Sequence, residues 1–419
     1  MDSTYSYPKL RWPIELRMER LEEEDVLLLR CPVGLTPQPL LLVSAVAPIV
    51  TLFDGALSFQ QILDRFSPQG LSSETLQQLI KLLDDNLFIA NGKFHAASKA
   101  MREQYRSLPE RLPALAGLSY PDTADRLALL VDGYMTAETS TDELTTVVGD
   151  VPMVCLVAPH IDYRRGGAIY GKIYPRLAQS RADLYILIGT AHQYSTHLFH
   201  LSTKDFRSPL GVARCNVPFV TQLASRFGVD RAFADEYLHK QEHSLELQLP
   251  FFSRIKPDGV IAPILVGGFH DIVSVQRSPS EWEEYNTFAS SLAEGLTEWN
   301  RAGHTFCFVA GVDMAHIGAS FGDPGNLTPE RMREIAIRDS EYLAAIECGD
   351  KDRLFSHIAE DGDARRMCGF PTMYTVLDVL ERIGQKFTAD AVYYDQAVDY
   401  TRDCAVTFAG VSMGAALGK

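Results

Sequence analysis

The sequence predicts an α/β protein in which a central mixed or mostly parallel sheet is flanked by helices, with a small winged-helix domain before it. Five apolar runs predict the sheet because they are continuous, as strands buried on both faces are. They are Met153–Ala158, Leu184–Gly189, Val260–Gly268, Phe306–Gly311 and Cys404–Met413. Helical patterns separate these runs, at residues 127–134, 168–179, 220–227, 284–299 and 329–347. This alternation is typical of α/β folds.

Length and composition set the domain organisation and exclude some partners. A chain of 419 residues, of which 46% are hydrophobic, exceeds one ordinary core, so we expect two domains, 1–108 and 109–419. The net charge of -15 opposes binding to nucleic acid or to anionic membranes. Seven cysteines lack a CxxC pair, and no signal peptide or membrane-spanning run is recognisable. We therefore expect a cytoplasmic protein without a disulfide framework.

The first domain begins with strand and helix patterns. The run "DVLLLR" at residues 25–30 predicts a strand. Ser58 followed by Gln61 is the pattern of a capping box, and it predicts a helix over "SFQQILDRF". Ser72 or Ser73 starts a second predicted helix, whose apolar residues share one face.

The end of this domain predicts a hairpin and then a linker. Asn91-Gly92 is the signal of a type I′ turn between two short strands, which would complete a winged helix. Residues 96–120, with Pro109 and Pro113, predict a linker. The pieces "LFDG", "SFQQIL" and "LLDDNLFI" resemble PqqD-like domains. That resemblance implies recognition of a peptide or partner protein, with a radical-SAM protein or a precursor peptide as candidate partners.

Polar residues follow the ends of three predicted strands. His160 and His192 end two of the apolar runs, and a third run continues into Asp313 and His316. The segment "DMAHIGASFGD" around these last two residues, like "SPLG" at 208–211, predicts a tight turn that shapes the pocket. In open α/β sheets the carboxyl ends of the strands meet at one crevice. Because neutral imidazole is the commonest metal ligand, the sequence predicts a metal site there.

Seven pieces, spread over about residues 115 to 415, occur in the order found in the Memo-like family, including the AmmeMemoRadiSam system protein B. They are "APHIDYRRGGAIYGKIY", "ILIGTAH", "SPLGVARCNV", "EHSLELQLPFF", "APILVGG", "GVDMAHIG" and "RRMCGFPTMYTVL". The resemblance implies a fold similar to class III extradiol dioxygenases, which are non-haem iron enzymes. It implies His160, His192 and Cys368 as metal-site residues, with His316 at the acid–base position, supported by Asp313.

The proposed cysteine ligand bears on the metal. Cys368 follows two arginines in "ARRMCGFP", and nearby positive charge would favour the thiolate that binds a metal. The alternative is a buried, inert thiol. A thiolate softens the site, so iron, copper or zinc would suit it better than magnesium. We expect Fe2+, with copper or zinc as alternatives.

Two further groups carry candidate roles. Asp162, Arg164 and Arg165 stand in "PHIDYRRGG", where many relatives read "PHAGY" followed by Ser-Gly. Arginine forks bind carboxylates bidentately, and the two glycines would let a ligand approach the backbone, so a carboxylate- or phosphate-bearing substrate is predicted. The alternative is a solvated turn in which Asp162 pairs with an arginine.

The second group is an H-x-x-E-H pattern. His239, Glu242 and His243 match the inverted zinc-peptidase signature. The Memo-like resemblance directs only Glu242 and His243 toward the cleft, as catalytic candidates. Glu246 is an alternative residue for orienting His243.

Three functions remain open from the sequence. The first is a metal-dependent oxidoreductase or dioxygenase-like protein, with non-haem iron, that acts on a small aromatic or peptide-borne substrate. In it His316, with a pKa near neutrality, transfers protons. The second is a non-catalytic scaffold that binds iron, copper or a peptide. The third is a zinc peptidase that uses the H-x-x-E-H pattern.

Overall fold

The computed structural model describes residues 3–138 and 152–416. The chain forms two compact units, Met1–Leu108 and Pro109–Lys419. None of the helices in the described ranges is both long enough and apolar enough to cross a membrane.

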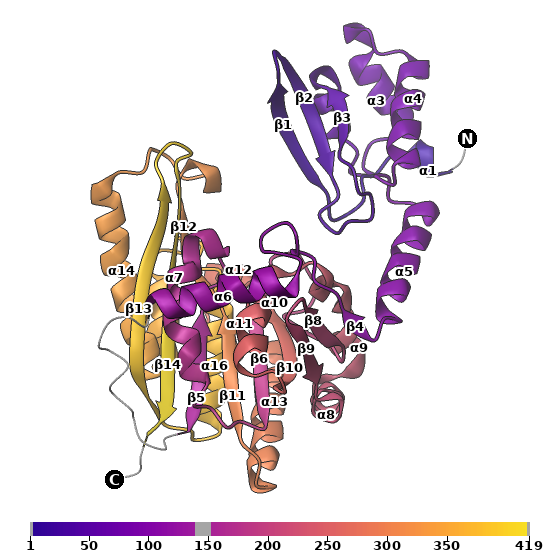
Figure 1. Cartoon of the computed structure of the whole chain (residues 1–419). Coiled ribbons are helices and arrows are strands. Elements are labelled where there is room, and N and C mark those ends of the chain that lie inside the picture. Colours follow the sequence, from indigo (N-terminus) through magenta and orange to yellow (C-terminus); the bar gives the residue numbers. More distant parts are fainter. Residues whose placement is uncertain (1–2, 139–151, 417–419) are drawn as a thin grey trace. The chain divides into compact units, whose positions relative to one another are not determined.

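The N-terminal unit combines a three-stranded antiparallel sheet with helices (Figure 1). Its strands are β1 (Glu15–Leu21), β2 (Glu24–Arg30) and β3 (Leu40–Val43). Its helices are α1 (Ser3–Ser6), α2 (Ala47–Val50), α3 (Phe59–Phe66), α4 (Ser73–Asp85) and α5 (Gly92–Arg106). Leu27 and Leu29 of the sheet share one buried cluster with Ile62 of α3 and Leu83 of α4.

The helix caps predicted for this unit are confirmed, but the hairpin predicted at its C-terminal end is not. Ser58 and Gln61 form the predicted capping box, and Ser72 caps α4. The predicted hairpin at Asn91-Gly92 is wrong, because the Asn91 side chain accepts from the Phe94 amide and α5 begins at Gly92. Asparagine favours helix N-caps as well as turns, and helix-forming residues follow it here. The same helix occupies the first part of the predicted linker at residues 96–120.

The second unit is built on a mixed sheet, which confirms the predicted fold class. Four parallel strands form its centre, in the order β5 (Met153–Ala158), β11 (Phe306–Gly311), β6 (Leu184–Thr190) and β10 (Val260–Val266). β14 (Cys404–Ala415) pairs antiparallel with β5, and both β12 (Asp313–Ile317) and β13 (Phe387–Asp399) pair with β14. Beyond β10 lie β9 (Gly211–Cys215), β8 (Asp205–Ser208) and β4 (Glu110–Arg111), while β7 (Phe199–Leu201) also pairs with β10.

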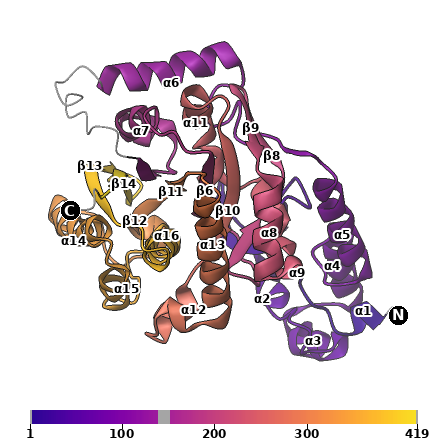
Figure 2. The same ribbon diagram turned by 90° about the horizontal axis from the view of Figure 1, so that it is seen from below.

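Helices cover both faces of this sheet (Figure 2). One face carries α7 (Tyr163–Leu177) and α11 (Leu249–Ile255), with α6 (Ala124–Glu138) outside them. The other face carries α8 (Val217–Phe227), α13 (Glu283–Arg301), α14 (Pro329–Cys348) and α16 (Phe370–Arg382), with α12 (His270–Ser274) and α15 (Lys351–Ala359) farther out.

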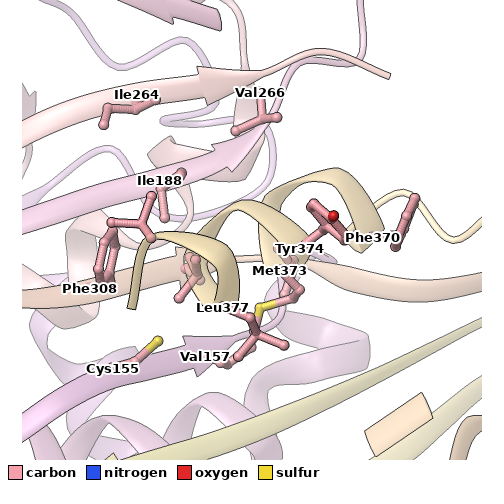
Figure 3. Close-up of a cluster of buried hydrophobic side chains, with 14 of the residues drawn as sticks. Cys155, Val157, Ile188, Ile264, Val266, Phe308, Phe370, Met373, Tyr374 and Leu377 are labelled. Carbon is pink, nitrogen blue, oxygen red and sulfur yellow. The ribbon is translucent and has the colours of Figure 1, made fainter. Parts of the chain in front are cut away.

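Successive residues of the central strands pack on opposite faces. Figure 3 shows Cys155 and Val157 of β5 in one cluster with Met373 and Leu377 of α16. Leu156, between the first two, belongs instead to the cluster on the α7 side. Burial on both faces explains why these strands are continuously apolar in sequence.

The glycines near the start of α7 allow close helix packing. A Cβ on Gly167 would lie 2.3 Å from the Tyr134 ring of α6, and a Cβ on Gly171 would lie 2.4 Å from the Tyr134 carbonyl oxygen. A Cβ on Gly166 would lie 2.5 Å from Ile161. The prediction that the Gly166-Gly167 pair admits a ligand is therefore wrong, because neighbouring protein atoms fill that space.

One of the two predicted turns begins as a strand. Residues 313–317 form β12, which pairs with β14, a partner about ninety positions away that local sequence cannot reveal. The turn follows it, as a short 3-10 helix at Ala319–Phe321 that ends at Gly322. The tight turn predicted at residues 208–211 is confirmed, since Ser208 ends β8 and Gly211 begins β9, while its role in shaping the pocket stays a prediction.

Candidate metal centre

His160 follows β5 and is fixed by the neighbouring strand β11. Its Nδ1 lies 3.0 Å from the carbonyl oxygen of Gly311, the last residue of β11. Because a carbonyl only accepts, Nδ1 carries the proton and Nε2 is free to bind a ligand. The His160 amide also donates to Asp313 Oδ1 over 2.8 Å, and the imidazole is buried. The ring orientation is thus set on two sides.

His192 follows β6 and is fixed by Glu242. Its Nδ1 lies 2.9 Å from Glu242 Oε1, and its amide donates to Oε2 over the same distance. His243 Nδ1 lies 3.1 Å from Glu242 Oε1. The buried carboxylate therefore orients two imidazoles at once and leaves both Nε2 atoms free.

Cys368 precedes α16 and lies against His160. Its Sγ is 3.3 Å from His160 Nε2, and its carbonyl oxygen accepts from Thr190 Oγ1 over 2.9 Å. Each of His160, His192 and Cys368 offers one ligand atom, and these three atoms lie within 4.8 Å of one another. The structure thus brings together three residues from distant parts of the chain at the carboxyl ends of the strands.

A second group overlaps the first. His192, Glu242 and His243 also offer atoms within 4.8 Å of one another, and the rings of His192 and His243 stack at 4.4 Å. The His160 ring lies 4.9 Å from that of His192 and 5.1 Å from that of His243. The Glu242 carboxylate already accepts hydrogen bonds from both neighbouring imidazoles. It is therefore better suited to orienting ligands than to binding a metal.

Burial favours the ligand form of His160. Burial, followed by electrostatic repulsion from the neighbouring His192 and His243 imidazoles, holds the pKa of His160 well below its usual range, so this imidazole is neutral. Burial opposes ionisation of Glu242, but the two histidines hold its pKa well below the ordinary value. Burial lowers the pKa of His243, yet Glu242 outweighs it and the net shift is upward.

The pKa of the Cys368 thiol is shifted in the direction opposite to the predicted one. Burial, and then the charge of Asp313, raises the pKa of its thiol well above the ordinary value. The preceding arginines do not favour the thiolate because they are paired elsewhere: Arg365 Nε donates to Asp361 and an Arg366 nitrogen lies 2.7 Å from Asp323. A bound cation would supply the positive charge that these arginines do not.

Asp313 supports His160 rather than His316. Asp313 Oδ1 accepts from the amides of His160 and Ile161, and burial raises the pKa of this carboxyl to about 6. The predicted support of His316 by Asp313 is therefore wrong. His316 is fixed instead by its amide, which donates to the Arg365 carbonyl, and by its Nδ1, 3.1 Å from the Met314 carbonyl oxygen.

His316 is less basic than predicted. Burial lowers its pKa to about 4, and the positive charges of His192 and His243 act in the same direction. The expected pKa near neutrality is wrong for this site without an ion. His316 is neutral at physiological pH, so its unprotonated ring nitrogen is able to accept a proton.

The H-x-x-E-H residues do not form a peptidase site. His239 belongs to a 3-10 helix (Glu236–Lys240) that ends before α10 (His243–Glu246), so the two histidines are not on one helical turn. His239 Nε2 lies 3.1 Å from the His200 carbonyl oxygen. Glu246 does not orient His243, because it accepts from Tyr120 and pairs with Arg111.

Asp162, Arg164 and Arg165 lie at the start of α7. Asp162 caps the helix by accepting from the Arg164 amide, and it pairs with Arg165 Nε over 2.6 Å, as the alternative interpretation expected. The three residues line a cavity of about 600 Å³, and its described lining does not include the three candidate ligands.

Two contacts of the site were not predicted from the sequence. The Gly311 carbonyl fixes His160, and a Cβ at Gly311 would lie 2.2 Å from the Ser244 carbonyl oxygen. Thr190 holds the backbone of Cys368. The sequence offered one signal for the first contact, because Gly311 is a glycine at the end of a buried strand. It offered no signal for the contact of Thr190 with Cys368.

The fold and these side chains define an α/β protein with a candidate transition-metal centre. The chain belongs to the Memo-like family, since the family model described as "Memo-like protein" matches residues 111–412. This confirms the resemblance drawn from the sequence motifs.

Two proteins of this family match most of the chain at 24–25% sequence identity. A "MEMO1 family protein" of Aquifex aeolicus is 24% identical over 390 residues, covering 92% of this chain and 96% of its own length. That match is longer than Pro109–Lys419, so it extends into the N-terminal unit. A MEMO1 family protein of Methanobrevibacter smithii is 25% identical over 298 residues, covering 70% of this chain and 95% of its own.

Proposed function

We propose that the Pro109–Lys419 unit binds one transition-metal ion, iron by preference, and uses it as a dioxygenase-like oxidoreductase on a small aromatic or peptide-borne substrate. The observation that carries this proposal is the grouping of His160, His192 and Cys368, whose ligand atoms lie within 4.8 Å of one another. The proposed ligand atoms are Nε2 of each histidine and Sγ of Cys368.

The chemistry of the donor set fits such an ion. Two neutral imidazoles and a thiolate form a set that suits iron, copper or zinc better than magnesium or calcium. Both histidines donate Nδ1–H to an oxygen, as metal-bound histidines in proteins commonly do. Three protein ligands leave coordination positions for water or substrate. The side chains of His192 and His243 are 32% and 38% exposed, which supports access from that side.

The surrounding residues would handle protons. A bound ion would supply Lewis acidity and, with iron, redox chemistry. In this proposal, the Nε2 atom of neutral His316 accepts a proton from a substrate hydroxyl. His243, whose pKa is raised by Glu242, holds a proton that it can donate. Glu242 and Gly311 keep the ligand rings in one orientation.

Metal analysis after anaerobic purification tests the ligand set. We expect about one iron per chain, and its loss in His160→Ala, His192→Ala and Cys368→Ser. His95→Ala is a matched control, because His95 is exposed and lies in the N-terminal unit. Full metal content in both variants of the ligand histidines would reject the proposal.

Oxygen consumption separates an enzyme from a metal-binding scaffold. Catechols, aminophenols and modified peptides are the test substrates, and turnover should fall sharply in His316→Ala. Stoichiometric metal without turnover on any of them would favour the non-catalytic alternative.

We further propose that the N-terminal unit docks a partner, as the PqqD resemblance implies. A radical-SAM protein or a precursor peptide encoded nearby should co-purify with the full chain. Equal co-purification after removal of residues 1–108 would contradict this role.

A further inference from the structure

A cavity of about 600 Å³ opens at the start of α7. Its described walls come from three segments of the second unit: the loop before α6, the first turn of α7, and the end of β13 with the turn that leads into β14. They contribute Leu118 and Ser119; Asp162, Arg164 and Arg165; and Ala397, Val398, Asp399, Arg402 and Cys404. Three of these residues are arginines, each able to donate several hydrogen bonds to an anion.

The two carboxylates of this cavity are engaged by their own loops. Asp162 accepts from the Arg164 amide and from Arg165 Nε. Asp399 Oδ1 accepts from the Thr401 amide and hydroxyl and from the Arg402 amide. These local bonds occupy the acidic groups and leave guanidinium donors available to a ligand.

The arginines are incompletely paired. Within residues 3–138 and 152–416, no hydrogen bond or ion pair of the Arg164 guanidinium is found. Arg402 lies 3.7 Å from Asp399 and its side chain is 83% exposed. The cavity therefore has one more positive than negative side chain, in a chain whose net charge is -15. A local excess of this sign attracts anions.

The cavity lies at the same edge of the sheet as the candidate metal centre. Asp162 is two residues beyond His160. β14 runs antiparallel to β5, so its first residue, Cys404, lies beyond the carboxyl end of β5. The next residue, Ala405, pairs with Ile317, which adjoins His316. The cavity therefore lies at the carboxyl edge of the central strands, the edge at which His160 follows β5.

Helix capping explains only part of this arrangement. It accounts for Asp162 and its pairing with Arg165, but it requires neither Arg164 nor an arginine from the β13–β14 connection. Guanidinium groups from separate elements that face one cavity are the usual means of holding a carboxylate or a phosphate.

We propose that this cavity binds the anionic group of the substrate, a carboxylate or a phosphate, through Arg164, Arg165 and Arg402. Calling this ligand the substrate rests on the proposed function. The inference narrows the proposed substrate to an anionic aromatic or peptide-borne molecule. The anion site itself does not depend on a bound metal.

Ligand-observed NMR on the full-length, metal-free protein at low ionic strength tests the site, with benzoate and inorganic phosphate as separate probes. At least one probe should bind, and Arg164→Gln and Arg402→Gln should each weaken it about 10-fold or more. Arg301→Gln is the control, because Arg301 is exposed in the last turn of α13. It should bind the probe as the wild type does.

The outcomes separate this inference from the proposed function. Binding of benzoate alone assigns an aromatic carboxylate, and binding of phosphate alone assigns a phosphoryl group. If neither probe binds, or if both arginine variants bind as tightly as Arg301→Gln, the anion site is refuted even when metal content is normal. Conversely, retained anion binding with full metal content in both His160→Ala and His192→Ala would refute only the metal proposal.

Discussion

Replacing Glu242 with glutamine is expected to weaken metal binding by about 10- to 100-fold, although Glu242 is not a proposed ligand. Four N–H groups lie within 3.1 Å of its carboxylate oxygens: the His192 amide and Nδ1, the His243 Nδ1 and the Ser244 amide. The carboxylate is buried, so water does not readily replace it. It fixes the tautomer and direction of two imidazoles.

The magnitude follows from the geometry of the substitution. Glutamine keeps one oxygen but places an NH2 group where the second oxygen accepted a hydrogen bond. At least one buried donor then faces another donor, which costs about 1–3 kcal/mol. A 10- to 100-fold loss of affinity corresponds to about 1.4–2.8 kcal/mol, which is the same range.

Competition of the protein with a chromogenic chelator measures this affinity, with Fe2+ under anaerobic conditions or with Zn2+. Glu236→Gln is the matched control, because Glu236 is also buried but bonds to Ser202 Oγ rather than to an imidazole. Unchanged metal affinity in Glu242→Gln, or an equal loss in both variants, would refute this reasoning.

Three other changes test the structure around the site. Gly311→Ala would place a Cβ 2.2 Å from the Ser244 carbonyl oxygen, so we expect a loss of about 2–3 kcal/mol in unfolding free energy, together with reduced metal content. Asp339→Asn removes a buried carboxylate 3.4 Å from Arg365, whose carbonyl holds the His316 amide; about 3 kcal/mol of stability should be lost. Burial lowers the pKa of His239 to about 3, so the unfolded chain binds the extra proton first, and stability should fall as the pH drops from about 6.5 toward 3, by up to about 4 kcal/mol.

Urea unfolding measures all three effects. Wild-type stability and metal content in Gly311→Ala would contradict the close contact between β11 and α10. Asp339→Asn should also lower turnover if His316 moves; a stability loss below about 1 kcal/mol would contradict the buried pair. His239→Gln should flatten the acid dependence, and an unchanged pH profile would show that another group causes it.

The sequence was most informative where strands are buried on both faces. The runs of β5, β6, β10 and β11 are continuous because each residue meets a helix layer. β13 was missed because it is only half-buried and mixes aspartate with tyrosine in "FTADAVYYDQAVD". Asn91-Gly92 was misread because the choice between a turn and a helix cap depends on packing of residues that follow it.

The sequence predicted which residues form the site, but it did not predict which charges surround them. Strand ends and family motifs singled out His160, His192 and Cys368, which the fold brings together. The charge around Cys368 was not predictable, because the acidic partners of Arg365 and Arg366 include residues far along the chain. Tertiary pairing, not sequence proximity, decides which charges a thiol experiences.

X-ray absorption spectroscopy of the zinc-loaded protein tests the proposed ligand set most directly. A metal at His160, His192 and Cys368 predicts one sulfur neighbour at about 2.3 Å and imidazole nitrogens at about 2.0–2.1 Å, with the sulfur lost in Cys368→Ser. A zinc ion without a sulfur neighbour, or one that keeps it in Cys368→Ser, would contradict the account.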